Sequence, residues 1–119
     1  MKAGLLALLL ALSAAAEVRT ISAYCPCKKC CGAWASKRPE TASGTVPKQG
    51  RTVAAPRSVP FGSRVTIQGI GTLIAEDRLA AKYDGRYDVF MADHEAARRF
   101  GVRRLNVTVA PKPNTRRKQ

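Results

Sequence analysis

The chain is divided into short apolar segments, and this division limits what it can fold into. Alternation of apolar and polar side chains predicts six strands, within residues 18–24, 51–56, 58–67, 72–76, 87–91 and 103–109. One helix, HEAARRF, is expected between an N-cap at Asp93 and a stop at Gly101. Because strands that close on themselves leave no exposed edge, we expect a mainly β fold, a small six-stranded barrel with one short helix.

The two ends of the chain differ from its middle. Lys2, an apolar run over residues 4–12 and small residues at 14–16 match the parts of a secretory signal peptide. A buried N-terminal helix is the alternative. We therefore expect an exported protein of the periplasm or cell envelope. Its expected parts are a cleavable signal peptide over 1–16, one domain over 17–110 and a basic disordered tail over 111–119.

The charge of the chain is strongly positive. Lys and Arg number 21 against 8 Asp and Glu, a formal net charge of +13. An exported protein with this balance is expected to bind anionic cell-envelope polymers. Nucleic acid is not expected as a partner, because one Trp, three Tyr and three Phe do not interleave with the basic residues as a stacking platform requires. A monomer is expected.

All four cysteines lie in one Cys-rich loop over 25–31, YCPCKKCCG, as Cys25, Cys27, Cys30 and Cys31. Export favours oxidation, so local structural disulfides among these four are the preferred interpretation. A zinc site made of the same four thiolates is the competing interpretation, although four ligands within seven residues are crowded for a closed tetrahedral site. Redox exchange is a weaker third. We expect no cofactor.

Three aspartates, Asp77, Asp84 and Asp88, lie in the stretch LIAEDRLAAKYDGRYDVF, in a chain with only eight acidic residues. Asp77 ends one predicted strand and Asp88 begins the next, so both can project from one end of a sheet. This predicts a site with paired carboxylates. The structural alternative is that these acids are solvated and balance the basic residues around them.

The order of motifs along the chain resembles the 3D domain of bacterial exported proteins, over roughly residues 21–109. The motifs are SAYCPCKKCCG, TASGTVPKQG, VAAPRSVPFGSRVTIQGIG, the stretch from Asp77 to Asp88, and DHEAARRFG. That domain is similar to the catalytic barrel of membrane-bound lytic transglycosylase A. The resemblance therefore implies a double-psi β-barrel that acts on peptidoglycan.

The family's aspartates are assigned one at a time. Asp77 and Asp88 match two of them at the family's spacing, and the third falls on Ala55. The resemblance implies that Asp88 is the catalytic acid, with Asp77 in support. It also places Thr41 and Ser43 beside the acids. We further expect Asp84 to line the cleft or to prepare a turn, and Tyr24 to contact sugar or to fill the core.

The chemistry predicts further features of Asp88. A lytic transglycosylase uses the 6-hydroxyl of muramic acid in place of water, so one carboxyl group can serve as acid and then as base. Asp88 must then be protonated, and we expect partial burial and the charge of Asp77 to raise its pKa. Arg78 and Arg86 are expected to point away from the cleft. His94 is expected at the helix start, as a cap or exposed to solvent.

Two functions follow from these observations. The first is an exported peptidoglycan-cleaving enzyme, a lytic transglycosylase acting on glycan strands. The second is a non-catalytic barrel that binds or loosens the cell wall, which the absence of the third family aspartate at Ala55 favours.

Overall fold

The computed structural model describes residues 15–27 and 40–113. Three predicted features lie wholly or mostly outside these residues. They are most of the predicted signal peptide, Cys30 and Cys31 of the Cys-rich loop, and most of the predicted tail. Within the described residues, no helix has the length and apolar character needed to cross a membrane.

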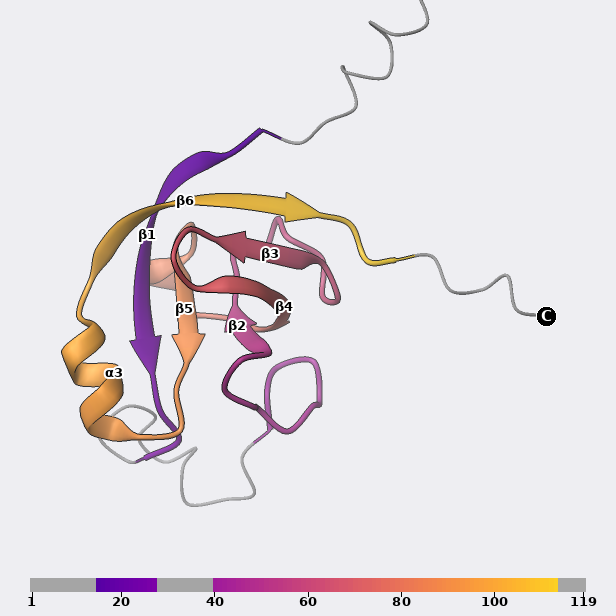
Figure 1. Cartoon of the computed structure of the whole chain (residues 1–119). Helices are drawn as coiled ribbons and strands as arrows, with labels where there is room; N and C mark the ends of the chain where they lie inside the picture. The colour runs from indigo at the N-terminus through magenta and orange to yellow at the C-terminus, as the bar shows by residue number, and fades with distance from the viewer. Residues whose placement is uncertain (1–14, 28–39, 114–119) are drawn as a thin grey trace, which may run out of the picture.

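The described residues form a closed barrel of six strands in the order β1-β5-β2-β4-β3-β6 (Figure 1). The strands are β1 (Glu17–Tyr24), β2 (Thr52–Ala54), β3 (Arg64–Ile67), β4 (Gly71–Asp77), β5 (Tyr87–Phe90) and β6 (Arg103–Ala110). β1 pairs with β5 and β2 with β4 in parallel, and the other neighbours are antiparallel. The predicted mainly β barrel with one helix is confirmed at this level.

The alternation of side chains explains why the strands close around one core. In β3, Val65 and Ile67 are buried, while Arg64 and Thr66, which alternate with them, face solvent. The same period of two puts apolar residues from every strand inside the barrel. The inward residues include Ile21, Val53, Val65, Ile67, Leu73, Ala75, Val89 and Val107.

Helix α3 (His94–Phe100) covers one end of the barrel beside β1 (Figure 1). Its N-cap is Asp93, whose carboxylate accepts a hydrogen bond from the backbone N–H of Ala96 at 2.9 Å. Ala97 and Phe100 are buried, and Gly101 ends the helix with a φ of 68°, which suits glycine. The predicted cap and stop are both confirmed. A short 3-10 helix, η2 (Ala81–Tyr83), lies between β4 and β5.

Strand β2 brings the two central aspartates together. Ala54 pairs with Asp88 of β5 on one side and with Asp77 of β4 on the other. The register between β2 and β4 shifts between Val53 and Ala54, and Ala55 N–H donates to the carbonyl of Asp77 at 3.0 Å. The two aspartates thus lie two strands apart at one level of the barrel, roughly 10 Å between backbones.

Candidate functional site

Asp88 lies on β5 at the edge of a surface cleft. It is partly buried, and its Oδ1 accepts a hydrogen bond from the Oγ of Ser22 at 3.1 Å. Ser22 is its register partner on β1, which explains why the two side chains meet. The cleft has a volume of about 250 Å³ and is lined by Ser22, Ala23, Tyr24, Leu79, Tyr83, Arg86 and Asp88.

The pKa of Asp88 is raised from 3.8 to about 6. Burial is the largest cause, because it removes water from the charged form. The hydrogen bond from Ser22 and the positive charge of Arg86 lower the pKa, while the negative charge of Asp77 raises it. The expected direction is confirmed, with burial as the main cause. Near pH 6 this carboxyl group can therefore donate and accept a proton.

Asp77 is held by three hydrogen bonds at the end of β4. Tyr24 donates its hydroxyl to Oδ2 at 2.7 Å, and the backbone N–H groups of Ala42 and Arg78 each donate to Oδ1 at 2.9 Å. These donors come from three different segments of the chain, so they fix the orientation of the carboxylate. Asp77 does not itself line the cleft among the described residues.

Tyr24 connects the cleft with Asp77. Its side chain lines the cleft, its hydroxyl reaches Asp77, and its ring meets that of Phe90 edge to face with centroids 5.4 Å apart. Phe90 is its register partner on β5. Tyr24 therefore fills a core contact and presents polar and aromatic surface to the cleft at the same time.

Thr41 and Ser43 lie in the loop that supports Asp77. Thr41 is buried, and its hydroxyl contacts those of Ser43 at 3.1 Å and Thr45 at 2.7 Å. The backbone N–H of Ser43 donates to the carbonyl of Glu76, and the backbone N–H of Ala42 in the same loop donates to Asp77 Oδ1. The expected packing beside the acids is confirmed for Asp77. Neither residue lines the cleft, so substrate contact by Thr41 or Ser43 stays a prediction.

Glu76 is a buried carboxylate that the sequence analysis did not single out. It is 8% exposed, accepts the Thr52 hydroxyl at 2.7 Å and pairs with Arg51 at 3.1 Å. Arg51 also donates to the carbonyl of Val46. This ion pair therefore ties β4 to the loop after residue 40. No pattern within its own strand would have indicated it, since both partners lie far apart in sequence.

Asp84 lies outside the cleft lining. It is exposed, accepts the backbone N–H of Arg57 at 2.9 Å and forms an ion pair with the Arg57 guanidinium at 3.7 Å. Its contacts connect the loop before β3 with the turn at Gly85. They match the turn role expected for this residue, and a role in substrate binding stays a prediction.

The two arginines near the acids differ in direction. Arg78 donates to the carbonyl of Val59 at 2.9 Å and lies over the ring of Phe61, away from the cleft lining, as expected. Arg86 lines the cleft, so the expectation that it points away is wrong. The turn after η2 explains the difference, because it brings Arg86 over the ring of Tyr83 at the mouth of the cleft.

Ala55, which the motif resemblance aligns with a third aspartate, is fully buried in the core cluster. Its backbone still contacts the site, since its N–H donates to the Asp77 carbonyl and its carbonyl accepts from Arg78. The site thus has two of the three carboxylates that the resemblance implies.

Cys25, Cys27 and His94 gather beyond the end of β1. The sulfur atoms of Cys25 and Cys27 are 2.9 Å apart, longer than the roughly 2.05 Å of a disulfide, so no disulfide joins these two. The predicted disulfides and zinc ligands at Cys30 and Cys31 lie outside the described residues. His94 is partly buried and faces the two sulfurs, so the expected cap or solvent position is wrong for its ring. Asp93 provides the cap instead.

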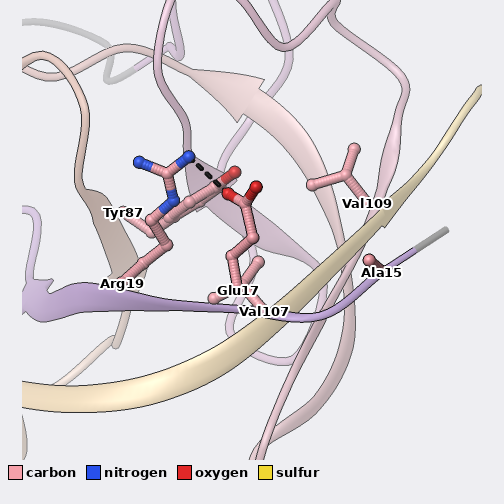
Figure 2. Close-up of a pocket in the computed structure, with 6 residues that line it drawn as sticks. All are labelled: Ala15, Glu17, Arg19, Tyr87, Val107 and Val109. Atoms are coloured by element: carbon pink, nitrogen blue, oxygen red, sulfur yellow. Dashed lines mark hydrogen bonds and ion pairs between the residues drawn. The ribbon is translucent and has the colours of Figure 1, made fainter.

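A second hollow of about 180 Å³ lies over β1 and β6 (Figure 2). Figure 2 shows Arg19 and Glu17 joined by an ion pair, with Tyr87, Val107, Val109 and Ala15 around them. The ion pair has a nitrogen-to-oxygen distance of 2.6 Å. Cleavage at the predicted site would remove Ala15 from its wall. Its one acid is neutralised by Arg19, so the Asp88 cleft is the better candidate for chemistry.

The comparisons with known proteins add no relative. No protein-family model matches the chain, and no curated protein matches it closely enough to count as a relative. The candidate site therefore rests on its geometry and on the motif resemblance.

Proposed function

We propose that this protein is an exported peptidoglycan-cleaving enzyme, a lytic transglycosylase that acts on glycan strands with Asp88 as its acid and base. The observation that carries the proposal is a partly buried carboxyl group at a surface cleft with a pKa of about 6. A carboxyl group with its ordinary pKa would be almost fully ionised at neutral pH and could not act as an acid.

One carboxyl group is enough for this reaction. Asp88 donates its proton to the bridging oxygen as the bond from that oxygen to the anomeric carbon of muramic acid breaks. The 6-hydroxyl of the same sugar then attacks the anomeric carbon, and its proton returns to Asp88. The products are a free 4-hydroxyl end and a 1,6-anhydro ring, and no water is consumed. Hydrolysis would need a second carboxylate to activate water.

The surrounding residues have supporting roles in this mechanism. Ser22 orients the carboxyl group of Asp88 through its hydroxyl. Asp77 contributes negative charge that raises the pKa of Asp88 and favours the cationic sugar in the transition state. Tyr24 and Tyr83 offer aromatic surface to a sugar ring at the cleft. Arg86 opposes the acid form of Asp88, and its charge suits acidic groups of the wall polymer.

The finer assignment of the fold belongs to the same proposal. The closed mixed barrel is compatible with the double-psi topology of the 3D domain that the motifs indicate. We assign residues 1–16 to a signal peptide and the protein to the periplasm or cell envelope. Its partners would be glycan strands and anionic envelope polymers rather than nucleic acid, and it would act as a monomer.

A non-catalytic barrel that binds or loosens the wall is the second candidate. Two observations favour it. Ala55 replaces a carboxylate of the family with a buried methyl group. The cleft, at about 250 Å³, also lies below the roughly 300–1,000 Å³ of typical ligand pockets, so it holds little more than one sugar ring.

Mass spectrometry of the soluble products from purified peptidoglycan tests the proposal. We expect anhydro-muropeptides from the native protein and none from Asp88→Asn. The matched control is Glu95→Gln, which removes an exposed carboxylate of α3 outside the cleft and should retain activity. Products that contain an added water would retain the site but change the reaction to hydrolysis. No release by the native protein, with continued sedimentation on the wall, would favour the binding barrel.

A further inference from the structure

Two cysteines and the one histidine of the chain form a compact cluster at the end of the barrel that bears α3. The Nδ1 of His94 lies 3.4 Å from the sulfur of Cys25 and 3.2 Å from the sulfur of Cys27, and the two sulfurs are 2.9 Å apart. The three donor atoms all lie within 4.8 Å of one another. Cys25 is fully buried, and the other two are partly buried.

The fold itself assembles this cluster from distant parts of the chain. Cys25 directly follows Tyr24, the last residue of β1, and the backbone N–H of Met91 donates to the Tyr24 carbonyl at 2.8 Å. Asp93 then caps α3 and places His94 in its first turn. Figure 1 shows the start of α3 beside the end of β1. The contact between Cys25 and His94 spans 69 residues of sequence.

We propose that Cys25, Cys27 and His94 bind one Zn²⁺ ion through two thiolates and an imidazole nitrogen. These are the ligand types that zinc selects, at about 2.3 Å from sulfur and about 2.0–2.1 Å from nitrogen. Two thiolates on one tetrahedral zinc lie about 3.7 Å apart. The observed 2.9 Å is between this value and a disulfide bond, so a small side-chain rotation suffices. A further thiolate or a water would complete the tetrahedron.

The position of His94 favours metal over a disulfide. A disulfide needs only sulfur, whereas here the imidazole nitrogen lies at similar distances from both sulfurs. Convergence of an imidazole on two thiolates is the arrangement of a zinc site with mixed ligands. Thiolates bound to zinc are also withheld from oxidation, which suits cysteines in an exported protein.

The proposed ion would join β1 to the start of α3. Tyr24, the residue before the first ligand, donates to Asp77 and lines the Asp88 cleft. The site would therefore hold one wall of the cleft in place from outside it. The zinc proposal is based on the positions of the three donor atoms and does not depend on peptidoglycan cleavage.

Zinc titration of the full chain tests this proposal. The protein is purified under reducing conditions and stripped with a chelator, then titrated with Zn²⁺ against a chromophoric competitor. We expect one equivalent to bind and the melting temperature to rise. His94→Ala and Cys27→Ser should each bind Zn²⁺ at least about tenfold more weakly. Glu95→Gln is the matched control, because it changes an exposed residue of the same helical turn and should bind like the native chain.

Cobalt spectra keep the test informative if a variant folds poorly. With Co²⁺ in place of zinc, the native chain should show thiolate charge-transfer bands and the strong visible bands of a tetrahedral site. His94→Ala should keep the former and change the latter. No Zn²⁺ binding by the reduced native chain would overturn the proposal. Equal binding by the native chain and His94→Ala would also overturn it, because the histidine would then not be a ligand.

Discussion

Ser22 and Asp88 are register partners across the parallel strands β1 and β5, and the Ser22 hydroxyl donates to the Asp88 carboxylate at 3.1 Å. This hydrogen bond lowers the pKa of Asp88, whereas burial, the main cause of its shift, raises it. The pKa of about 6 thus reflects two main opposing effects: burial raises it, and the hydrogen bond from Ser22 lowers it. The first prediction follows from that balance.

Ser22→Ala should raise the pKa of Asp88 further, because it removes a donor that stabilises the anion. The fall of wall-cleaving activity above about pH 6 should then move to higher pH. Ser22→Thr retains a hydroxyl and is the control, with a profile near the native one. If Ser22→Ala leaves the pH profile of activity unchanged, or shifts it to lower pH, the role of this hydrogen bond is contradicted.

Asp88→Asn should stabilise the fold increasingly as pH rises. The native-state pKa of about 6 exceeds the ordinary 3.8, so between these values the folded protein binds more protons than the unfolded chain. The stability contributed by the protonated acid is full below about pH 4 and is lost as pH rises through about 6. Asn mimics the neutral acid and avoids this loss.

The free energy of unfolding of Asp88→Asn, relative to that of the native protein, should therefore increase by about 2 kcal/mol between pH 4 and pH 7, as measured by urea unfolding. Taking the difference between two chains cancels the other titrating groups. A difference for Asp88→Asn that is constant with pH would show that the Asp88 pKa is not raised.

Tyr24→Phe should lower activity while leaving the barrel folded. The ring contact with Phe90 is kept, but the hydroxyl that donates to Asp77 at 2.7 Å is lost. Loss of this hydrogen bond should cost about 1 kcal/mol in unfolding free energy. Product release from peptidoglycan should fall several-fold more than binding to the wall does. Equal loss of both would indicate that the Tyr24 hydroxyl contributes equally to binding of the ground state and the transition state.

Arg51→Gln should destabilise the protein by about 1–2 kcal/mol, because it leaves the Glu76 carboxylate buried with only the Thr52 hydroxyl as a side-chain partner. Adding Glu76→Gln removes the uncompensated charge and should restore part of the loss. Chemical unfolding of the single and double variants measures this coupling. Additive losses in the double variant would mean that the ion pair does not tie β4 to the loop.

The sequence predicted much of the fold because its signals were local. Alternation located all six strands, and the cap at Asp93 and the stop at Gly101 located the helix. The proximity of Asp77 and Asp88 was also expected, although the sequence could not show that Ala54 pairs with both. Pattern arguments work here because a strand or a cap depends on neighbouring residues.

Contacts between distant segments were the part that sequence could not supply. Arg86 faces the cleft because the turn after η2 sets its direction. The charge of a residue does not predict the direction of its side chain. His94 meets Cys25 only because β5 and α3 return to the end of β1. Glu76 is buried against Arg51 for the same kind of reason. Each of these side chains is placed by tertiary packing.

The central claim is that Asp88 is the acid that cleaves the glycan, and its most direct test is the yield of anhydro-muropeptides from purified peptidoglycan near pH 6. The expected result is release by the native protein and by Glu95→Gln, with none from a folded Asp88→Asn. Release by Asp88→Asn at the native rate would contradict the claim, because an amide at this position is too weakly acidic to protonate the leaving oxygen.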